Sequence, residues 1–277
     1  MTDRMEHIGS SLIQHGEHSE RIYLMKVAPA DCPEIVDELD ALACREGYSK
    51  IFAKVPVSVS QDFLDNGYRA EARVPQLYQG REEGVLLGKF LCSERLVERK
   101  PELVRDVLAK AAVQDDEGSQ ALPEGVELRP LNESDVEAAA TVYKEVFASY
   151  PFPIHDPRYL RDTMRDNVRY FGAWHKGRLA ALASAEMDRG ARHAEMTDFA
   201  TLPSFRGKGL ARILLTRMEH AVRKDGIRTA FTIARAYSYG MNITFARTGY
   251  RFGGTLRNNT QICGQQESMN VWYKPLS

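Results

Sequence analysis

The sequence lacks several features that would assign it to a functional class at once. It has four cysteines in 277 residues (Cys32, Cys44, Cys92 and Cys263), and no two of them form a CxxC motif. We therefore expect reduced, mostly buried thiols in a cytosolic protein rather than a disulfide framework. The seven histidines form no HExxH or similar pair, so we expect no metal site.

The chain also lacks an excess of charge and a long apolar run. Its formal net charge is −1 at pH 7, which gives no electrostatic reason to expect nucleic acid or an anionic membrane as a partner. No uncharged apolar stretch approaches the ~20 residues that span a bilayer. Residues 1–16 lack the apolar core of a secretory signal. We expect a cytoplasmic protein that binds neither nucleic acid nor membranes.

What remains is the composition of an ordinary globular protein. Hydrophobic residues make up 43% of the chain and charged residues 27%, and this length suits two domains. One polar stretch, AVQDDEGSQALPEG at 112–125, separates two segments of strong periodicity. We predict a smaller α/β domain over 1–111, a linker over 112–124 and a second domain over 125–277.

Hydrophobic periodicity predicts the elements of the second domain. Alternating segments indicate strands, and apolar residues three or four apart indicate helices. The predicted order is β-α-α-β-β-β-α-β-α-β-β, which implies a mixed sheet with helices on its faces. In chain order the elements are strand 126–131, helices 132–147 and 156–167, a hairpin over 168–187, strand 193–202, helix 210–225, strand 228–236, helix 239–248 and strands 250–258 and 268–276.

The first domain partly repeats the second. FLDNGYRAEARV at 63–74 and FARTGYRFGGTL at 245–256 share Phe, three residues and Gly-Tyr-Arg at an offset of 182. We predict that the first domain is a degenerate copy of part of the second. Its first strand-to-helix turn, APADC, has no paired glycines, so we do not expect it to bind what the second domain binds there.

The most informative motif lies between a predicted strand and a predicted helix. In RGKGLA, residues 206–211, two glycines stand where the first helical turn has unpaired backbone N–H groups and a partial positive charge. Gly207 and Gly209 remove the Cβ atoms that would keep an anion away, so the turn suits a phosphate or pyrophosphate. Arg212 breaks a GxGxxG pattern and GKG breaks a Walker A loop, which excludes both nucleotide motifs.

The setting of these glycines resembles the acetyl-CoA signature of the GNAT N-acetyltransferases. The pattern R-x-x-G-x-A follows an apolar strand, opens an amphipathic helix and precedes a strand, a short helix and Gly249-Tyr250. The resemblance implies an α/β GNAT acyltransferase fold, with a mixed, splayed sheet and helices on both faces, preceded by a smaller degenerate GNAT-like half-domain. It also implies that the loop amides hold the pyrophosphate of acetyl-CoA and that the pantetheine arm lies along the end of the preceding strand. The residues expected to bind coenzyme A are Phe199, Ala200, Thr201, Arg206, Gly207, Lys208, Gly209, Leu210 and Ala211.

Longer segments narrow the resemblance. The chain looks like the beta-lysine N-acetyltransferases in YPFPIHDPRYL (150–160), EMTDFATLPSFRGKGLA (195–211), YSYGMNITFARTGY (237–250) and ESMNVWYKPL (267–276). This resemblance implies acetylation of the terminal amine of beta-lysine, which gives the compatible solute Nε-acetyl-beta-lysine. Two alternatives stay open: another acceptor (a polyamine, another amino acid or a protein amine), and an acyl-CoA-binding module without catalysis.

Two acidic residues before the loop are candidates for the general base. A lysine-type ammonium, with a pKa of ~10.4, must lose a proton before its nitrogen attacks. Glu195 lies fourteen residues ahead of Gly209, the separation at which histone-type GNAT members carry their base. Asp198 is the second candidate, as base or as ammonium anchor. Strand alternation predicts one face for Glu195, Thr197 and Phe199 and the opposite face for Asp198.

The chain departs from the GNAT pattern where a general acid is expected. Many members carry Tyr four residues before the Gly-Phe/Tyr pair, whereas this chain has Phe245, which cannot donate a proton. Many also place Asn seven residues before that Tyr, where this chain has Ser238. We therefore expect Ser238 or Asn242 at the pantetheine arm. The acid role stays open between Tyr237, Tyr239 and no acid at all, and Phe245 favours the non-catalytic alternative.

The proposed acceptor predicts the chemistry of its pocket. Beta-lysine carries two ammonium groups and one carboxylate, so we expect acidic groups together with an Arg or Lys. The N-terminal domain is expected to shape the cleft or to form the contact of a homodimer. The candidate acceptor-binding residues are His155, Asp156, Asn258, Asn259, Glu267 and Asn270.

Overall fold

The structure, a computed structural model, describes residues 3–113, 121–262 and 264–276. Residues 114–120 of the predicted linker and Cys263 lie outside the described residues. Cys32, Cys44 and Cys92 are free thiols, but Cys44 is exposed and the other two are half-buried. The prediction of mostly buried thiols is therefore wrong for these three.

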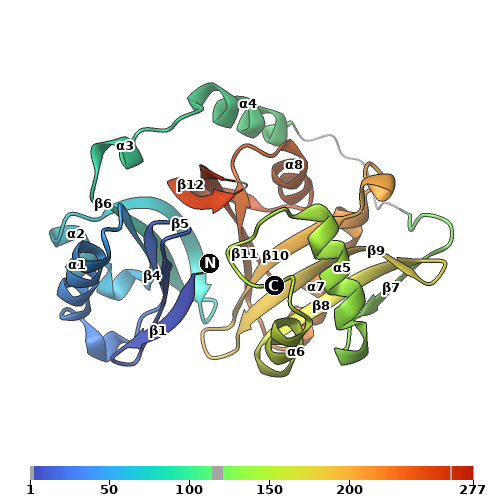
Figure 1. Ribbon diagram of the computed structural model, residues 1–277, viewed down its shortest axis with the longest axis horizontal. Helices are drawn as coiled ribbons and strands as arrows, with labels where there is room; N and C mark the ends of the chain where they lie inside the picture. Colours follow the sequence, from blue (N-terminus) through green and yellow to red (C-terminus); the bar gives the residue numbers. More distant parts are fainter. Residues whose placement is uncertain (1–2, 114–120, 263, 277) are drawn as a thin grey trace.

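The N-terminal half begins with a hairpin that the sequence pattern does not predict and continues as an α/β unit (Figure 1). Its strands are β1 (Arg4–Ile8), β2 (Ser11–Gly16), β3 (Arg21–Lys26), β4 (Lys50–Pro56), β5 (Arg69–Tyr78) and β6 (Glu82–Phe90). Its helices are α1 (Ile35–Glu46), α2 (Ser60–Asp65), α3 (Ser93–Leu96) and α4 (Pro101–Ala112).

The C-terminal half has the predicted order of elements, β-α-α-β-β-β-α-β-α-β-β. Its strands are β7 (Val126–Pro130), β8 (Val168–His175), β9 (Arg178–Asp188), β10 (His193–Thr201), β11 (Thr229–Arg235), β12 (Arg251–Ile262) and β13 (Gln265–Pro275). Its helices are α5 (Val136–Val146), α6 (Pro157–Asp166), α7 (Leu210–Lys224) and α8 (Tyr239–Arg247).

All thirteen strands of the described residues form one sheet, in the order β1-β2-β3-β4-β6-β5-β12-β13-β11-β10-β9-β8-β7. The halves meet where β5 pairs with β12 through Ala72 and Gly254. A Cβ on Gly254 would lie 2.2 Å from the carbonyl oxygen of Glu71 and 2.7 Å from the Cα of Ala72. Only glycine therefore lets the two strands approach this closely.

The two halves share one strand order about this junction. It is β2-β3-β4-β6-β5 in the first half and β9-β10-β11-β13-β12 in the second. In each half one parallel pair, β3–β4 or β10–β11, is connected through a helix, α1 or α7. Ala72 and Gly254, which pair at the junction, are 182 residues apart, the offset of the repeated motif. The shared order supports the predicted internal repeat.

The Phe-x₃-Gly-Tyr motif also forms the same turn in both halves. Gly67 and Gly249 both have a φ of +84°, the left-handed conformation that commonly ends a helix. The tyrosine that follows donates its backbone N–H to the phenylalanine carbonyl, at 3.2 Å from Tyr68 and 3.0 Å from Tyr250. In each half the two aromatic rings pack edge to face. One short motif therefore fixes how α2 and α8 end.

Helices cover both faces of the C-terminal half of the sheet. Helix α7 buries Leu210, Leu214, Met218 and Val222, spaced four apart, against β9 and β10. Helices α5 and α6 pack on the opposite face in a separate core. Between these layers, the turn from β10 to α7 borders solvent, with residues 206–208 exposed.

Helix α4 crosses from the N-terminal half to the C-terminal half, where it lies against α8 (Figure 1). Leu108 and Ala111 of α4 join the core formed by α7. The predicted boundary at residue 112 assigns α4 to the first domain, although α4 packs against the second half. The division into two domains therefore stays a prediction. In the ranges that the structure describes, no helix is long and apolar enough to cross a membrane.

Candidate active site

A groove at the N-terminus of α7 contains the glycine turn. Gly207 and Gly209 have φ of +74° and +70°, a left-handed conformation that glycine adopts without strain. A Cβ on Gly207 would meet no atom within 4 Å, so the space beside this turn is open. Eight predicted coenzyme A residues line the groove, together with Arg212, Thr244 and Arg247: they are Phe199, Thr201, Arg206, Gly207, Gly209, Leu210, Ala211 and Ser238. Three arginines beside a glycine-rich helix N-terminus suit a pyrophosphate.

Three other predicted coenzyme A residues lie outside this groove. Ala200 is buried in the core beneath α5 and α6. The Lys208 ammonium lies 4.9 Å from the centre of the Phe205 ring. Asn242 is fully buried, and its amide makes four hydrogen bonds within the protein. Because these bonds occupy its amide, we omit Asn242 from the coenzyme A site.

Strand β10 lines both this groove and a second cavity. It pairs with the parallel strand β11 only over His193–Glu195, and its pairing with β9 shifts register just after Thr197. Asp198, with a φ of +55°, lies in this β-bulge, which turns its side chain into the cavity of Glu195 and Thr197. The predicted alternation is therefore wrong beyond Thr197, and Phe199 instead lines the groove.

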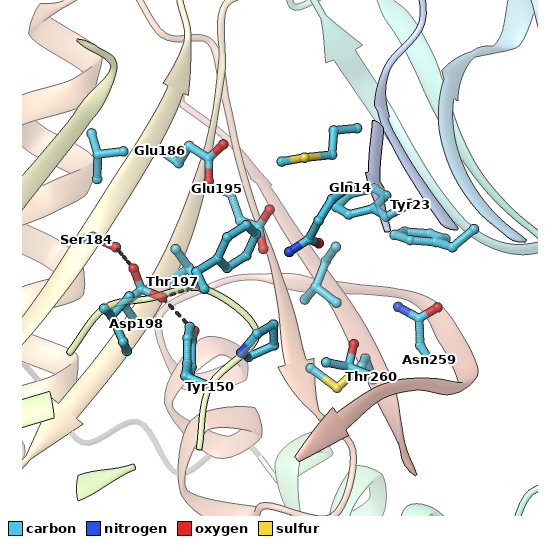
Figure 2. A pocket seen from close by; sticks show the side chains of 18 of the residues that line it. Gln14, Tyr23, Tyr150, Ser184, Glu186, Glu195, Thr197, Asp198, Asn259 and Thr260 are labelled. Carbon is cyan, nitrogen blue, oxygen red and sulfur yellow. Dashed lines mark hydrogen bonds between the residues drawn. The ribbon is translucent and has the colours of Figure 1, made fainter. Parts of the chain in front are cut away.

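The second cavity lies between the two halves of the chain (Figure 2). The C-terminal half contributes the carboxylates of Glu186, Glu195 and Asp198, and the N-terminal half contributes side chains of β2, β3 and β4. In the described part of the chain, no three acidic, His or Cys side chains are grouped as metal ligands. Because β10 borders both spaces, an acetyl donor bound in the groove and an amine bound in the cavity would meet at the bulge.

Asp198 is held by hydroxyl groups. Tyr150 Oη and Ser184 Oγ each donate to one of its carboxylate oxygens at 2.5 Å, as Figure 2 shows, and Thr197 Oγ1 donates at 3.4 Å. Burial raises the pKa of Asp198 above its usual range, and these donors reduce the rise. With both oxygens engaged, Asp198 is better suited to hold the shape and charge of the cavity than to accept a proton.

Glu195 has the properties of a general base. Burial, and then the negative charge of Glu186 across the β9–β10 pair, raise its pKa to about 8 against the opposing charge of Lys54. A base is most efficient when its pKa lies near the working pH, because it is then both ionised and a strong acceptor. An ordinary glutamate, with a pKa of ~4.3, would be a far weaker acceptor for an ammonium proton.

Among the predicted acceptor-binding residues, the described structure places only Asn259 in the cavity lining. Asn258, Glu267 and Asn270 are buried, and their side chains bond to other parts of the protein. These bonds engage the Glu267 carboxylate, the Asn270 amide and the amide nitrogen of Asn258 around β12 and β13, and none of the three residues lines the cavity.

The loop before α6 enters the cavity with residues other than those predicted. Tyr150, Phe152 and Ile154 line it. Asp156 instead caps α6 by accepting the backbone N–H of the second helical residue, which lowers the pKa of its carboxyl. His155 precedes this cap and lies outside the cavity lining. The loop therefore supplies an apolar wall and one hydroxyl group.

Neither tyrosine considered as general acid lines the groove or the cavity among the described residues. Tyr237 donates its hydroxyl to Glu98 at 2.6 Å, and Tyr239 donates to Asp106 at 2.5 Å. Both hydroxyls thus face the segment around α4. The alternative in which coenzyme A leaves without a tyrosine acid therefore fits this geometry better.

The N-terminal half lines the cavity, which is one of the two roles expected for it, but the sequence pattern does not identify the residues that do so. Gln14 on β2 and Arg21 and Tyr23 on β3 belong to the lining, as do Ser184 and Glu186 on β9. Gln14, Arg21 and Glu186 are polar or charged side chains in largely apolar strands, which is the signal that identifies them in retrospect.

The matches to known proteins agree with this geometry. Residues 138–249 match the acetyltransferase (GNAT) family. The chain is 38% identical to a beta-lysine N(6)-acetyltransferase of Methanococcus maripaludis over 98% of both chains. It is 32% identical to a beta-lysine N(6)-acetyltransferase of Methanosarcina mazei, over 88% of this chain and 97% of the relative. It is 30% identical to the N-acetyltransferase YodP of Bacillus subtilis over 96% of both chains.

Proposed function

Because this chain belongs to the GNAT family of acetyltransferases, we propose that it transfers the acetyl group of acetyl-CoA to the terminal (N6) amine of beta-lysine. Two beta-lysine N(6)-acetyltransferases, similar over most of the chain, support this choice of acceptor. The product, N6-acetyl-beta-lysine, would serve as a compatible solute in osmotic adaptation. A cytoplasmic location and a homodimer remain predictions from the sequence.

The position of β10 carries this proposal. The strand borders the glycine-turn groove through Phe199 and Thr201 and the acidic cavity through Glu195, Thr197 and Asp198. A thioester held in the groove and an amine held in the cavity would then be neighbours at the bulge. Such placement converts a bimolecular reaction into an effectively unimolecular one.

The groove positions the donor. Acetyl-CoA, when bound, supplies a thioester whose carbonyl carbon is the electrophile. The amides at Gly207 and Gly209 and the Arg206 guanidinium hold its pyrophosphate, because a helix N-terminus and a nearby cation both favour an anion. Ser238 borders the arm that leads toward β10.

The cavity activates the acceptor. Glu195 takes a proton from the acceptor ammonium, and Asp198 stabilises that ammonium before the transfer. The neutral nitrogen then forms a C–N bond to the carbonyl carbon, the C–S bond breaks, and the nitrogen loses its second proton to solvent as the amide forms. Coenzyme A leaves as a thiolate, a good leaving group that takes its proton from solvent.

Release of free thiol from acetyl-CoA tests this proposal. Beta-lysine, α-lysine, spermidine and a lysine peptide are compared as acceptors under the same conditions. Fast release with beta-lysine and slow release with the others is the expected result. Release with another amine would retain the chemistry and reject the acceptor, whereas coenzyme A binding without release from any amine would favour a non-catalytic module.

A further inference from the structure

Arg21 is a buried cation without a paired anion. It is 5% exposed and lines the cavity, and Nη1 donates to the carbonyl of Asn259 at 2.6 Å and to Thr260 Oγ1 at 3.0 Å. The charge of Asp3 raises the pKa of Arg21 against the effect of burial, but no carboxylate of the described residues forms an ion pair with the guanidinium. A buried charge normally has an ionic partner, so the site is prepared for an anion.

Gln14 presents an unpartnered donor to the same cavity. It is 2% exposed, and its Nε2 has no hydrogen-bond partner. Figure 2 shows the amide nitrogen of Gln14 pointing into the cavity, between Glu195 and the segment of Asn259. A buried donor that stays unpaired is costly, which favours a ligand oxygen at this position.

Asn259 adds an acceptor beside these donors. It is 1% exposed, its Oδ1 has no partner, and its backbone carbonyl is the group that Arg21 binds. The opposite wall carries the carboxylates of Glu186, Glu195 and Asp198 (Figure 2). The cavity is therefore negative at the proposed reaction centre and carries a cation and an amide donor at its other end.

We propose that Arg21 and Gln14 bind the carboxylate of the acceptor, while Asn259 accepts a hydrogen bond from the ammonium next to that carboxylate. This inference rests on the proposed function and deepens it, because it assigns to the N-terminal half the selection of an amino acid over a simple diamine. In beta-lysine the carboxylate and the N6 amine are at opposite ends of the chain. Binding of the carboxylate at Arg21 directs the N6 amine toward Glu195.

The test compares beta-lysine with 1,4-diaminopentane, which is the same molecule without its carboxylate. The ratio of the two kcat/KM values measures how strongly the carboxylate is recognised. The wild-type enzyme is expected to prefer beta-lysine, and Arg21→Gln is expected to lower that preference about 10- to 100-fold, mainly through a higher KM for beta-lysine. Gln14→Leu, which keeps the side-chain size, should lower it by about 10-fold.

Arg95 provides a matched control. It is also buried, at 2% exposed, and donates to the carbonyls of Asn258 and Ser19 and to Ser49 Oγ without lining the cavity. Arg95→Gln should lower stability and leave the ratio unchanged.

The inference would be overturned if both Gln14→Leu and a folded Arg21→Gln kept the wild-type ratio of kcat/KM for beta-lysine to kcat/KM for 1,4-diaminopentane. If Arg21→Gln does not fold, the ratio in Gln14→Leu alone decides. Equal use of both amines by the wild-type enzyme would also overturn it, while leaving acetyl transfer intact. No thiol release from beta-lysine by the wild-type enzyme would instead reject the proposed function.

Discussion

The pKa of Glu195 should set the pH dependence of the reaction, and Glu186 should set part of that pKa. Burial and the charge of Glu186 raise the pKa of Glu195 to about 8, with a smaller contribution from Asp198 and an opposing one from Lys54. Only the ionised carboxylate accepts a proton, so about one eleventh of the enzyme would be active at pH 7 and about one hundredth at pH 6. Below pH 8, kcat/KM should therefore fall about tenfold per pH unit.

Glu186→Gln removes the neighbouring charge and keeps the shape of the side chain. The pKa of Glu195 should fall. The acid limb of the pH–rate profile, where kcat/KM falls with falling pH, should therefore move to lower pH. At pH 7 the gain in kcat/KM has an upper limit of about 11-fold, which is reached when all of Glu195 is ionised. Glu127→Gln removes an equal charge from an exposed position on β7 and should leave the limb at about pH 8.

Initial rates of thiol release between about pH 5.5 and 9.5, with the acceptor well below KM, measure this limb. In Glu195→Gln the limb should disappear and the rate should fall by about 10²- to 10⁴-fold, the usual contribution of a general base. A limb that does not move in Glu186→Gln would refute the electrostatic coupling. A limb that persists in Glu195→Gln would refute the assignment of the base.

Three further substitutions test the groove and the junction between the halves. Gly207→Ala should raise the KM for acetyl-CoA about tenfold and leave the KM for the acceptor nearly unchanged, because the methyl group strains a left-handed turn and enters the space proposed for the pyrophosphate. Steady-state kinetics with both substrates varied measure the two KM values. An unchanged KM for acetyl-CoA would mean that the turn is only structural. Gly254→Val should lower the free energy of unfolding by about 3 kcal/mol or more, since its Cβ would lie 2.2 Å from the Glu71 carbonyl; an unchanged urea midpoint would contradict this. Glu71→Gln should lower the free energy of unfolding by about 3–5 kcal/mol in the same urea assay, because the buried Lys50 ammonium, 2.7 Å from Glu71, would lose its anion. A loss below about 1 kcal/mol, which is typical of an exposed ion pair, would argue against this role.

Local patterns predict elements of the C-terminal half most clearly where an element has one strongly apolar face. Helix α7 is the clearest case: its apolar residues recur every three or four positions and become the buried face against β9 and β10. The glycine turn was equally local, since the helix N-terminus and its two glycines are adjacent in the chain. The elements and the glycine turn are therefore predictable from short segments.

The cavity was less predictable because its walls depend on local irregularity and on long-range pairing. Alternation along β10 assumes a regular strand, and the single positive φ at Asp198 puts that residue on the same face as Glu195. Arg21 meets Asn259 only because β5 and β12 join the two halves in one sheet. No short segment of the sequence carries that information.

The nitrogen that receives the acetyl group tests the central claim most directly. Beta-lysine and acetyl-CoA labelled in the acetyl group would be incubated with the enzyme, and the product examined by NMR. Acetyl transfer to N6 alone is the expected result, because the carboxylate site proposed at Arg21 would direct the amine farthest from it toward Glu195. Acetylation of the amine next to the carboxylate, or of neither amine, would contradict it.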